Sequence, residues 1–303
     1  MSLLLSPVSP ELTETDFAVF AHYAKHLGRA PKAKHYAFNT GDKYSHLKGQ
    51  GLEMLELRAY QPSDDLRHID WRVTARTGKA HTRLYAQEHE HQRLLMLDLS
   101  ADAYFGTRHT FIATRFIQLA AIIAWRSQQQ GDVLTYRLCF AGEDHQQQKL
   151  SNLSMLFQLL SRASQIINRS QAQASLQIAK PDAITKKMRN KDIILLTDKQ
   201  SLSPQELAHL HYLAEHNKVF WVQIIDDNAF NLAAGQYHIK HAKGSDLVNV
   251  SHTSAELARA SFIKHNQQLK HKLNHLGIEH LLFDLGEPPE GIARSLLSMG
   301  ALG

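Results

Sequence analysis

The hydrophobic pattern of the chain changes at about residue 93 and is regular from there to the end. Short apolar runs alternate with longer segments whose apolar residues recur at helical spacing. The apolar runs predict buried strands at 93–100, 132–140, 192–198, 218–226 and 278–285. The longer segments predict helices at 110–131, 151–163, 203–217 and 254–276, with a last helix after Pro288 and Pro289. This alternation predicts an α/β domain with a mainly parallel sheet and helices on both of its faces.

Two parts of the chain depart from this alternation. After the strand predicted at 218–226 comes a loop-rich piece that contains YHIKH and DLVNV. The first 92 residues combine an amphipathic helix at 11–28, an alternating strand at 53–60, and a hairpin in which a TGK turn joins 70–76 to 80–88. We therefore predict that residues 1–92 form an N-terminal helix and β elaboration packed on an α/β domain of residues 93–303.

Composition and charge narrow the range of functions. A single cysteine, Cys139, excludes an internal disulfide framework and suits a reducing compartment. No apolar run is long enough to span a bilayer, and the first residues lack the features of a secretory signal, so we expect a cytoplasmic location. The formal net charge of +5 is scattered rather than gathered in a basic stripe, so nucleic acid is not an expected partner. No phosphate-binding glycine-rich loop with its lysine occurs, so no nucleotide cofactor is expected.

Two of the predicted strands end in acidic and hydroxyl residues. Asp98 and Ser100 follow the first strand, and Thr197 and Asp198 close the third. In an open α/β sheet, ligands bind beyond the carboxyl ends of the strands, and these oxygens suit a divalent cation such as Mg²⁺ or Mn²⁺. The pattern predicts a cation site with Asp98, Ser100 and Asp198 as ligands and Asp102 and Thr197 as further candidates. The alternative is that Asp98 caps the loop after it and Asp198 caps the next helix.

A second group of charged residues lies in YQPSDDLRHIDWRVTAR, residues 60–76. Its three acids could bind the metal ion of a nuclease or phosphatase. Each acid has an arginine within a few residues, however, and a paired arginine competes with a cation for the same oxygens. We therefore favour a structural or partner-binding clasp, in which arginine–carboxylate pairs and a packed tryptophan fasten the segment to the α/β domain. Its members are Arg58, Asp64, Asp65, Arg67, Asp70, Trp71 and Arg76.

The region around this segment carries a longer motif. GQGLEMLELRAYQPSDDLRHIDWRVTARTGKAHTRLYAQE, residues 49–88, precedes LLMLDLS. Within it stand Gly49, Gly51, Glu53, Arg58, Tyr60, Pro62, Asp64, Asp65, Arg67, Ile69, Asp70, Trp71, Thr74, Ala75 and Arg76. In these positions the chain resembles the bacterial family called domain of unknown function fifty-eight, with Ser63 where that family usually has glycine.

The resemblance implies a fold, a site and a partner. The family is regarded as von Willebrand A-like, a Rossmann-like architecture, and is often paired with MoxR-type AAA+ ATPases. Asp98-x-Ser100 followed by Thr197-Asp198 is similar to the metal-ion-dependent adhesion site of von Willebrand factor A domains. That site reads Asp-x-Ser-x-Ser on its first loop, and Asp102 stands at the last of these positions here. Its middle-loop ligand has no evident counterpart, the nearby polar residues being Ser164, Asn168 and Ser170.

The expected function is therefore that of a non-enzymatic adaptor or assembly protein. It would bind a partner through the cation site and work with a MoxR-type ATPase on an unknown client protein. One alternative is a metal-dependent hydrolase that uses Asp64, Asp65 and Asp70. Another is a structural interaction module that binds its partner without a metal ion.

Overall fold

The computed structural model describes residues 9–28, 54–62, 64–85, 92–107, 110–171, 188–231, 233–241 and 244–302. The chain divides into two compact units. The larger unit comprises Met1–Ala33 and His91–Gly303, and the smaller unit comprises Lys34–Glu90. The predicted division between residues 92 and 93 placed the first helix with the β elaboration, whereas the contacts place that helix with the sheet.

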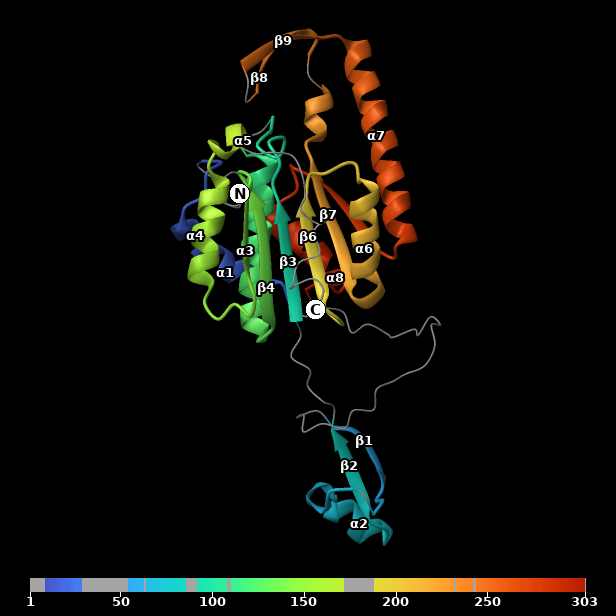
Figure 1. The fold of residues 1–303 in the computed structure, drawn as a ribbon. Coiled ribbons are helices and arrows are strands. Elements are labelled where there is room, and N and C mark those ends of the chain that lie inside the picture. The colour runs from blue at the N-terminus through green and yellow to red at the C-terminus, as the bar shows by residue number, and fades with distance from the viewer. Residues whose placement is uncertain are drawn as a thin grey trace. The chain divides into compact units, whose positions relative to one another are not determined.

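A six-stranded sheet forms the centre of the larger unit (Figure 1). Its strand order is β10-β7-β6-β3-β4-β5, and every neighbouring pair is parallel except β4 and β5. The strands are β3 (Gln92–Asp98), β4 (Val133–Phe140), β5 (Glu143–Gln147), β6 (Asp192–Thr197), β7 (Lys218–Ile225) and β10 (Glu279–Asp284). The predicted α/β fold with a mainly parallel sheet is confirmed. The antiparallel edge strand β5 was not predicted, because its sequence EDHQQ is polar throughout.

Helices cover both faces of this sheet, as predicted. The side chains of β3 alternate between the two cores: Leu95 and Leu97 join the core formed with α1, α3, α4 and α8, and Leu94 and Met96 join the core formed with α6 and α7. The helices are α1 (Glu14–His26), α3 (Ile112–Gln130), α4 (Leu153–Ser164), α5 (Asn168–Gln171), α6 (Pro204–His216), α7 (His252–His275) and α8 (Pro289–Ser298). None of the helices in the described part of the chain is both long and apolar enough to cross a bilayer.

Local capping chemistry explains where several helices begin and end. Ser203 and Glu206 form a capping box at the start of α6, each side chain accepting a hydrogen bond from the other residue's backbone N–H. Ser251 caps α7 in the same manner. Gly131 ends α3 in the left-handed conformation, at φ 76°, which glycine adopts without steric cost.

A β-hairpin stands where the sequence predicted a loop-rich piece. Strands β8 (Gly235–His241) and β9 (Gly244–Val250) pair in antiparallel register, from Gly235 opposite Val250 to His241 opposite Gly244. Leu247 and Val248 remain exposed. The hairpin has no strong apolar face, so the alternation that marks a half-buried strand is weak in its sequence.

The smaller unit pairs β1 (Met54–Ala59) with β2 (His81–Tyr85) in an antiparallel ribbon. Between them lie the 3₁₀ helix η1 (Leu66–His68) and the helix α2 (Trp71–Thr77). The prediction that 70–76 forms a strand of a hairpin was wrong. Asp70 caps α2, accepting hydrogen bonds from the N–H groups of Arg72 and Val73, and Gly78 ends it at φ 67°. The N-cap residue Asp70 and the terminal Gly78 therefore favour a helix over the predicted strand.

Helix α1 is part of the larger unit because its apolar face is buried against α3 and α4. Phe17 and Phe20 are almost fully buried, and the ring of Phe17 stacks on that of Phe157 with the centroids 5.1 Å apart. The indole N–H of Trp125 donates a hydrogen bond of 2.8 Å to the carbonyl of Phe17. The amphipathic helix predicted at 11–28 is therefore confirmed.

The loop after β3 leaves no room for a side chain at Gly106. A Cβ at this position would lie 2.1 Å from the carbonyl oxygen of Thr110, which is backbone and cannot swing away. We expect Gly106→Ala to lower the free energy of unfolding by about 1–3 kcal/mol, measured by urea denaturation. The matched control is Gly291→Ala on α8, where the nearest atom to the new Cβ is 3.4 Å away. That variant should gain about 0.5–1 kcal/mol, and equal stability of the two variants would contradict the prediction.

Candidate functional site

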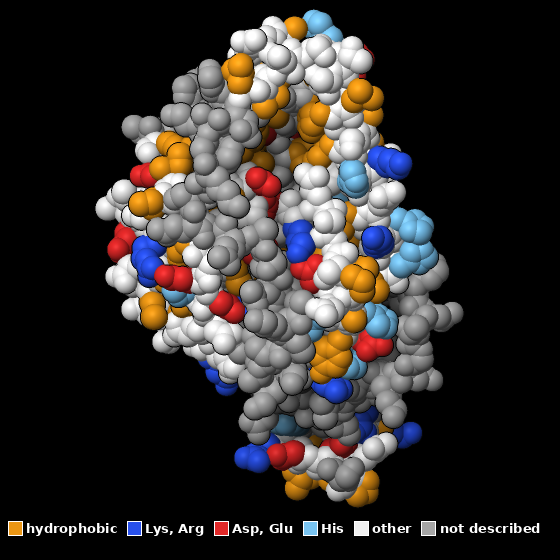
Figure 2. All heavy atoms as spheres, turned by 45° about the horizontal axis from the view of Figure 1, so that its top comes forward, with side chains coloured by type: hydrophobic (Ala, Val, Ile, Leu, Met, Phe, Trp, Pro, Cys, Tyr) orange, Lys and Arg blue, Asp and Glu red, His pale blue; other side chains and the backbone are white. Residues whose placement is uncertain are grey.

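A pocket of about 690 Å³ opens at the carboxyl ends of β3, β6 and β7. This is the edge of a parallel sheet at which α/β proteins bind ligands. Figure 2 shows hydrophobic side chains around a hollow in the larger unit, with acidic side chains beside it. Acidic and polar residues line one part of the pocket, and apolar residues line another. The two sets are Asp98, Ser100, Asp198 and Asp226, and Phe105, Ile112, Phe230 and Phe262.

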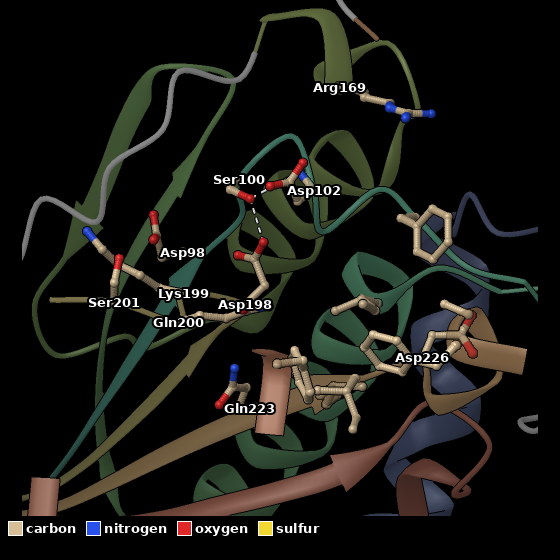
Figure 3. A pocket seen from close by; sticks show the side chains of 17 residues that line it. Asp98, Ser100, Asp102, Arg169, Asp198, Lys199, Gln200, Ser201, Gln223 and Asp226 are labelled. Atoms are coloured by element: carbon tan, nitrogen blue, oxygen red, sulfur yellow. Dashed lines mark hydrogen bonds between the residues drawn. The ribbon is translucent and has the colours of Figure 1, made fainter. Parts of the chain in front are cut away.

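The predicted cation ligands meet in this pocket because β3 and β6 are direct neighbours. Asp98 lies opposite Thr197 in the parallel register, so the loops after both strands start at the same level. The hydroxyl of Ser100 donates a hydrogen bond of 2.5 Å to the Oδ2 atom of Asp198 (Figure 3). Thr197 Oγ1 lies 3.5 Å from Asp98 Oδ2. The backbone N–H of Asp102 donates a hydrogen bond of 3.0 Å to Ser100 Oγ.

Burial gives the two carboxylates unusual acidities. Asp98 is 6% exposed, and its burial, together with the nearby charge of Asp198, raises the pKa of Asp98 to about 7. Burial also raises the pKa of Asp198, against the opposing effect of the hydrogen bond from Ser100. The ammonium group of Lys199 pairs with Glu206. In the described part of the chain, neither aspartate forms an ion pair, although Lys199 and Arg169 also line the pocket and the charge of Lys199 acts to lower the pKa of Asp98.

One oxygen of this couple has no hydrogen-bond partner. Asp198 Oδ1 is buried and accepts no hydrogen bond from any described residue. The alternative in which Asp198 caps the next helix is wrong, since the cap of α6 is Ser203. Asp226 Oδ1 in the same pocket is in the same condition, and a ligand atom, an ion or water can satisfy such an acceptor.

The polar residues suggested for the middle loop do not lie free to bind a cation. Ser164 Oγ accepts a hydrogen bond of 2.9 Å from the Leu12 N–H and donates to the Ser161 carbonyl. The amide of Asn168 donates to the Arg162 carbonyl at 2.7 Å. The side chain of Ser170 lies outside the described residues. Over the described ranges, no group of three or more His, Cys, Asp or Glu residues could hold a metal ion, so any cation here would rest on two carboxylates and hydroxyl groups.

Asp226 is a pocket residue that our reading of the sequence did not single out. It follows β7, is 4% exposed, and its Oδ2 accepts hydrogen bonds from Thr107 N–H (2.5 Å) and Thr107 Oγ1 (2.7 Å). Figure 3 shows it on the far side of the pocket from Asp98. The signal was present, since Asp226 is a third carboxylate at the end of a predicted strand. Its hydrogen-bond partner, Thr107, lies 119 positions away in the sequence, and no local sequence pattern connects the two residues.

In the smaller unit, the three acids of the predicted clasp are each held by an arginine. Asp64 pairs with Arg58 at 2.7 Å. Arg67 donates to both oxygens of Asp65. The hydrolase hypothesis required exposed acids together in a cleft, and carboxylates held in this way are poor metal ligands.

Asp70 has a different arginine from the one expected. Its Oδ2 pairs with Arg83 on β2 at 2.9 Å, while its Oδ1 caps α2. The hydrogen bonds from the Val73 backbone and from Arg83 hold the pKa of Asp70 below its usual range. Arg76 is exposed and forms no ion pair within the described ranges. Trp71 is 68% exposed, so it does not pack in the core of its own unit, and its role as a fastener to the α/β domain stays a prediction.

Comparison with known proteins places the chain in a family. The model of the family described as "Protein of unknown function DUF58" matches residues 56–272, which include most of the sheet and the clasp. The chain belongs to this family. Its relatives include the mycobacterial proteins Uncharacterized protein Rv1480 of Mycobacterium tuberculosis and Uncharacterized protein Mb1516 of Mycobacterium bovis. Each is 45% identical over 67 residues, and the match spans 22% of this chain and about a fifth of the relative's length.

The family assignment carries no activity with it. Among solved structures, a mutant of the PilB minor pilin from Streptococcus sanguinis aligns over 74% of this chain and 68% of its own, at 8% identity and a TM-score of 0.29. A similarity of this size supports no conclusion about the pocket. Function must therefore be argued from the residues themselves.

Proposed function

We propose that the chain is a non-enzymatic adaptor of von Willebrand A-like type that binds a partner protein through a divalent cation in the pocket. The observation that carries this proposal is the pair of buried carboxylates, Asp98 and Asp198, at the ends of two neighbouring strands. They repel one another in a site of low dielectric, and Lys199, the cation that acts on Asp98, is itself paired with Glu206 and offsets the repulsion only in part. A bound cation would remove that repulsion.

The residues present fit such an ion. Asp98, Ser100 and Asp198 offer hard oxygen donors, which Mg²⁺ and Mn²⁺ prefer, and Asp198 Oδ1 has no other partner among the described residues. Ser100 stands between the Asp102 N–H and Asp198, and its hydroxyl could turn from the carboxylate toward a cation. Thr197 and Asp102 are the further candidates. These few ligands leave positions for water or for an acidic group of a partner.

The partner follows from the family resemblance rather than from the pocket. A MoxR-type AAA+ ATPase is the proposed partner, and the two proteins would act together on a client that has yet to be identified. The chain itself offers no phosphate-binding loop, so ATP hydrolysis falls to the partner. We propose no hydrolase activity for Asp64, Asp65 and Asp70, since arginines hold their oxygens.

Titration of Mg²⁺ and Mn²⁺ into the metal-free protein tests the cation site. A ligand that binds only the folded state raises the melting temperature as its concentration passes the dissociation constant. We expect a saturable rise for the natural chain and none for Asp98→Ala. The matched control is Asp227→Ala, whose carboxylate is half exposed and pairs with Arg259 at 3.2 Å outside the couple. That variant should respond as the natural chain does. No rise, or an equal rise in Asp98→Ala, would leave the chain as a metal-free interaction module.

A further inference from the structure

The two edges of the six-stranded sheet differ in character. Strand β5 forms one edge and reads EDHQQ, a charged and polar sequence of the kind that discourages pairing with another chain. Strand β10 forms the other edge and reads EHLLFD. Among the described strands it pairs with β7 alone, and Leu282 on it is 42% exposed. In the described structure the β10 edge is therefore unpaired, with apolar residues 281–283 between polar ends.

The backbone of β10 presents hydrogen-bonding groups away from the sheet. The N–H of Leu285, just after the strand, donates to the carbonyl of Ile225 at 2.6 Å, toward β7. The N–H of Asp284 turns the other way and donates to Glu287 Oε1. Because successive residues of a strand alternate in direction, the N–H and C=O groups of His280 and Leu282 also face away from β7. These are the groups to which an added strand would pair.

A groove of about 610 Å³ lies beside this edge. Its lining comes mainly from β10, α7 and α8 with Met299 just after it, and in part from Ile225, Asp227 and Phe230 at and after the end of β7; α7 and α8 pack on opposite faces of the sheet. Phe262, Asn266 and Lys270 follow one another at intervals of four along α7 and so share a face. Ile263 and Met299 contribute apolar surface that is 47% and 42% exposed. The groove thus places a strand edge between two helices, with apolar side chains along it.

Asn266 gives the groove an unused polar group. The residue is 6% exposed, and neither its amide oxygen nor its amide nitrogen has a hydrogen-bond partner among the described residues. A buried amide without partners costs stability, and each such group in a native protein calls for an explanation. One donor and one acceptor side by side complement a peptide group, which offers the same two functions in reverse.

The charges of the groove favour an acidic occupant. Arg259 is held by Asp227, with the guanidinium 3.2 Å from the carboxylate. Lys270 is exposed and forms no ion pair over the ranges that the structure describes. An incoming carboxylate would therefore meet a free ammonium group at the α7 side of the groove.

We propose that β10 and this groove bind an extended, acidic segment of a partner protein as a seventh strand of the sheet. The backbone of the segment pairs with His280 and Leu282, and one of its peptide groups meets the amide of Asn266, whose side chain must turn toward the groove because its polar atoms are covered in the free protein. An apolar side chain of the segment packs between Ile263 and Met299, and an acidic one reaches Lys270. A second copy of the chain fits less well as the occupant. Its own α7 and α8 flank its β10 edge and would meet α7 and α8 of the first copy. The groove shares three lining residues, Ile225, Phe230 and Phe262, with the cation pocket but none of the proposed cation ligands.

Selection from a phage-displayed library of random linear peptides tests this proposal on the full chain. The counter-selection uses Leu282→Pro, which removes an N–H that faces away from β7 together with the leucine side chain; edge strands tolerate proline at such a position. We expect enriched peptides with alternating apolar residues and an acid. Measured by fluorescence polarisation, their affinity should fall at least tenfold for Leu282→Pro and for Asn266→Leu. In hydrogen exchange, the amides of His280 and Leu282 should gain protection when peptide is bound.

The control variant is Leu257→Ala, which removes an apolar side chain of α7 that is 67% exposed and does not line the groove. It should bind the peptides as tightly as the natural chain. Melting curves show whether each variant is folded. The proposal is overturned if no peptide is enriched, or if Leu282→Pro binds the enriched peptides unchanged. It is equally overturned if sedimentation shows a dimer that Leu282→Pro abolishes, since the edge would then belong to a second copy.

Discussion

Asp98→Asn should make the metal-free protein more stable at pH 8, by on the order of 4 kcal/mol, and should leave its stability near pH 4 almost unchanged. The folded-state pKa of Asp98 is about 7, compared with an ordinary value near 3.9 in an unfolded chain. As the pH rises from 4 to 7, the unfolded chain loses this proton while the folded protein keeps it, so folding becomes less favourable. Asparagine has nearly the same shape and carries no charge, so it avoids this loss.

Chemical denaturation of both proteins between pH 4 and pH 8, with a chelator present, measures the effect. The difference between the two proteins should open through the interval from pH 4 to 7 and level off above it. Saturating Mg²⁺ should close much of the gap at pH 8, because the cation stabilises only the natural chain. A difference independent of pH would mean that Asp98 is not the group responsible. Functional sites commonly keep residues that lower the stability of the free protein because those residues bind the ligand.

Asp132→Ala should cost about 3 kcal/mol of folding free energy, because it strands a buried cation. Arg93 is 1% exposed, and its guanidinium lies 2.8 Å from Asp132 Oδ2 and 2.7 Å from Ser127 Oγ. Burial already lowers the pKa of Arg93. Removing Asp132 takes away the hydrogen-bonded carboxylate and leaves Arg93 with only the charge of Asp192 nearby, and the loss of one partner of a buried pair costs far more than the pair contributes.

A double variant separates the effect of the unpaired charge from the effect of lost packing by the arginine stem. In Arg93→Met with Asp132→Ala, both charges of the hydrogen-bonded pair are gone, so part of the lost stability should return, although Asp192 then loses a cationic neighbour. Glu143→Ala is the control, since the Glu143–Arg162 pair is exposed on both sides and should change stability by about 0.5 kcal/mol or less. Urea denaturation gives all three values. A double variant as unstable as Asp132→Ala alone would show that packing of the arginine stem, rather than its charge, holds β3 to the end of α3.

In the clasp of the smaller unit, the kind of interaction was predicted correctly, but one of the pairing partners was not. Arginine–carboxylate pairing was predicted, and each acid has such a pair. The partner of Asp70, however, is Arg83 on β2 rather than an arginine of the motif itself. Pairing across the β1–β2 ribbon brought the two residues together, and no spacing rule connects positions 13 apart in a strand and a helix cap.

The sequence by itself determined the order of the main strands and helices of the sheet and the positions of Asp98, Ser100 and Asp198, but not β5, α2 or the β8–β9 hairpin. Strand and helix patterns are local, because they follow from the periods of 2 and 3.6 and from caps such as Ser203 and Gly131. Parallel strands carry their carboxyl ends to one edge, which is why Asp98, Ser100 and Asp198 could be assigned to one site before their contacts were known.

Only the tertiary structure decided what surrounds those residues. Desolvation raises the pKa of Asp98, and it depends on side chains packed from distant parts of the chain. The bond between Thr107 and Asp226 and the exposure of the β10 edge depend on strand order and helix packing in the same way. Such long-range contacts arise from the burial of whole faces, which a local pattern of residues does not specify.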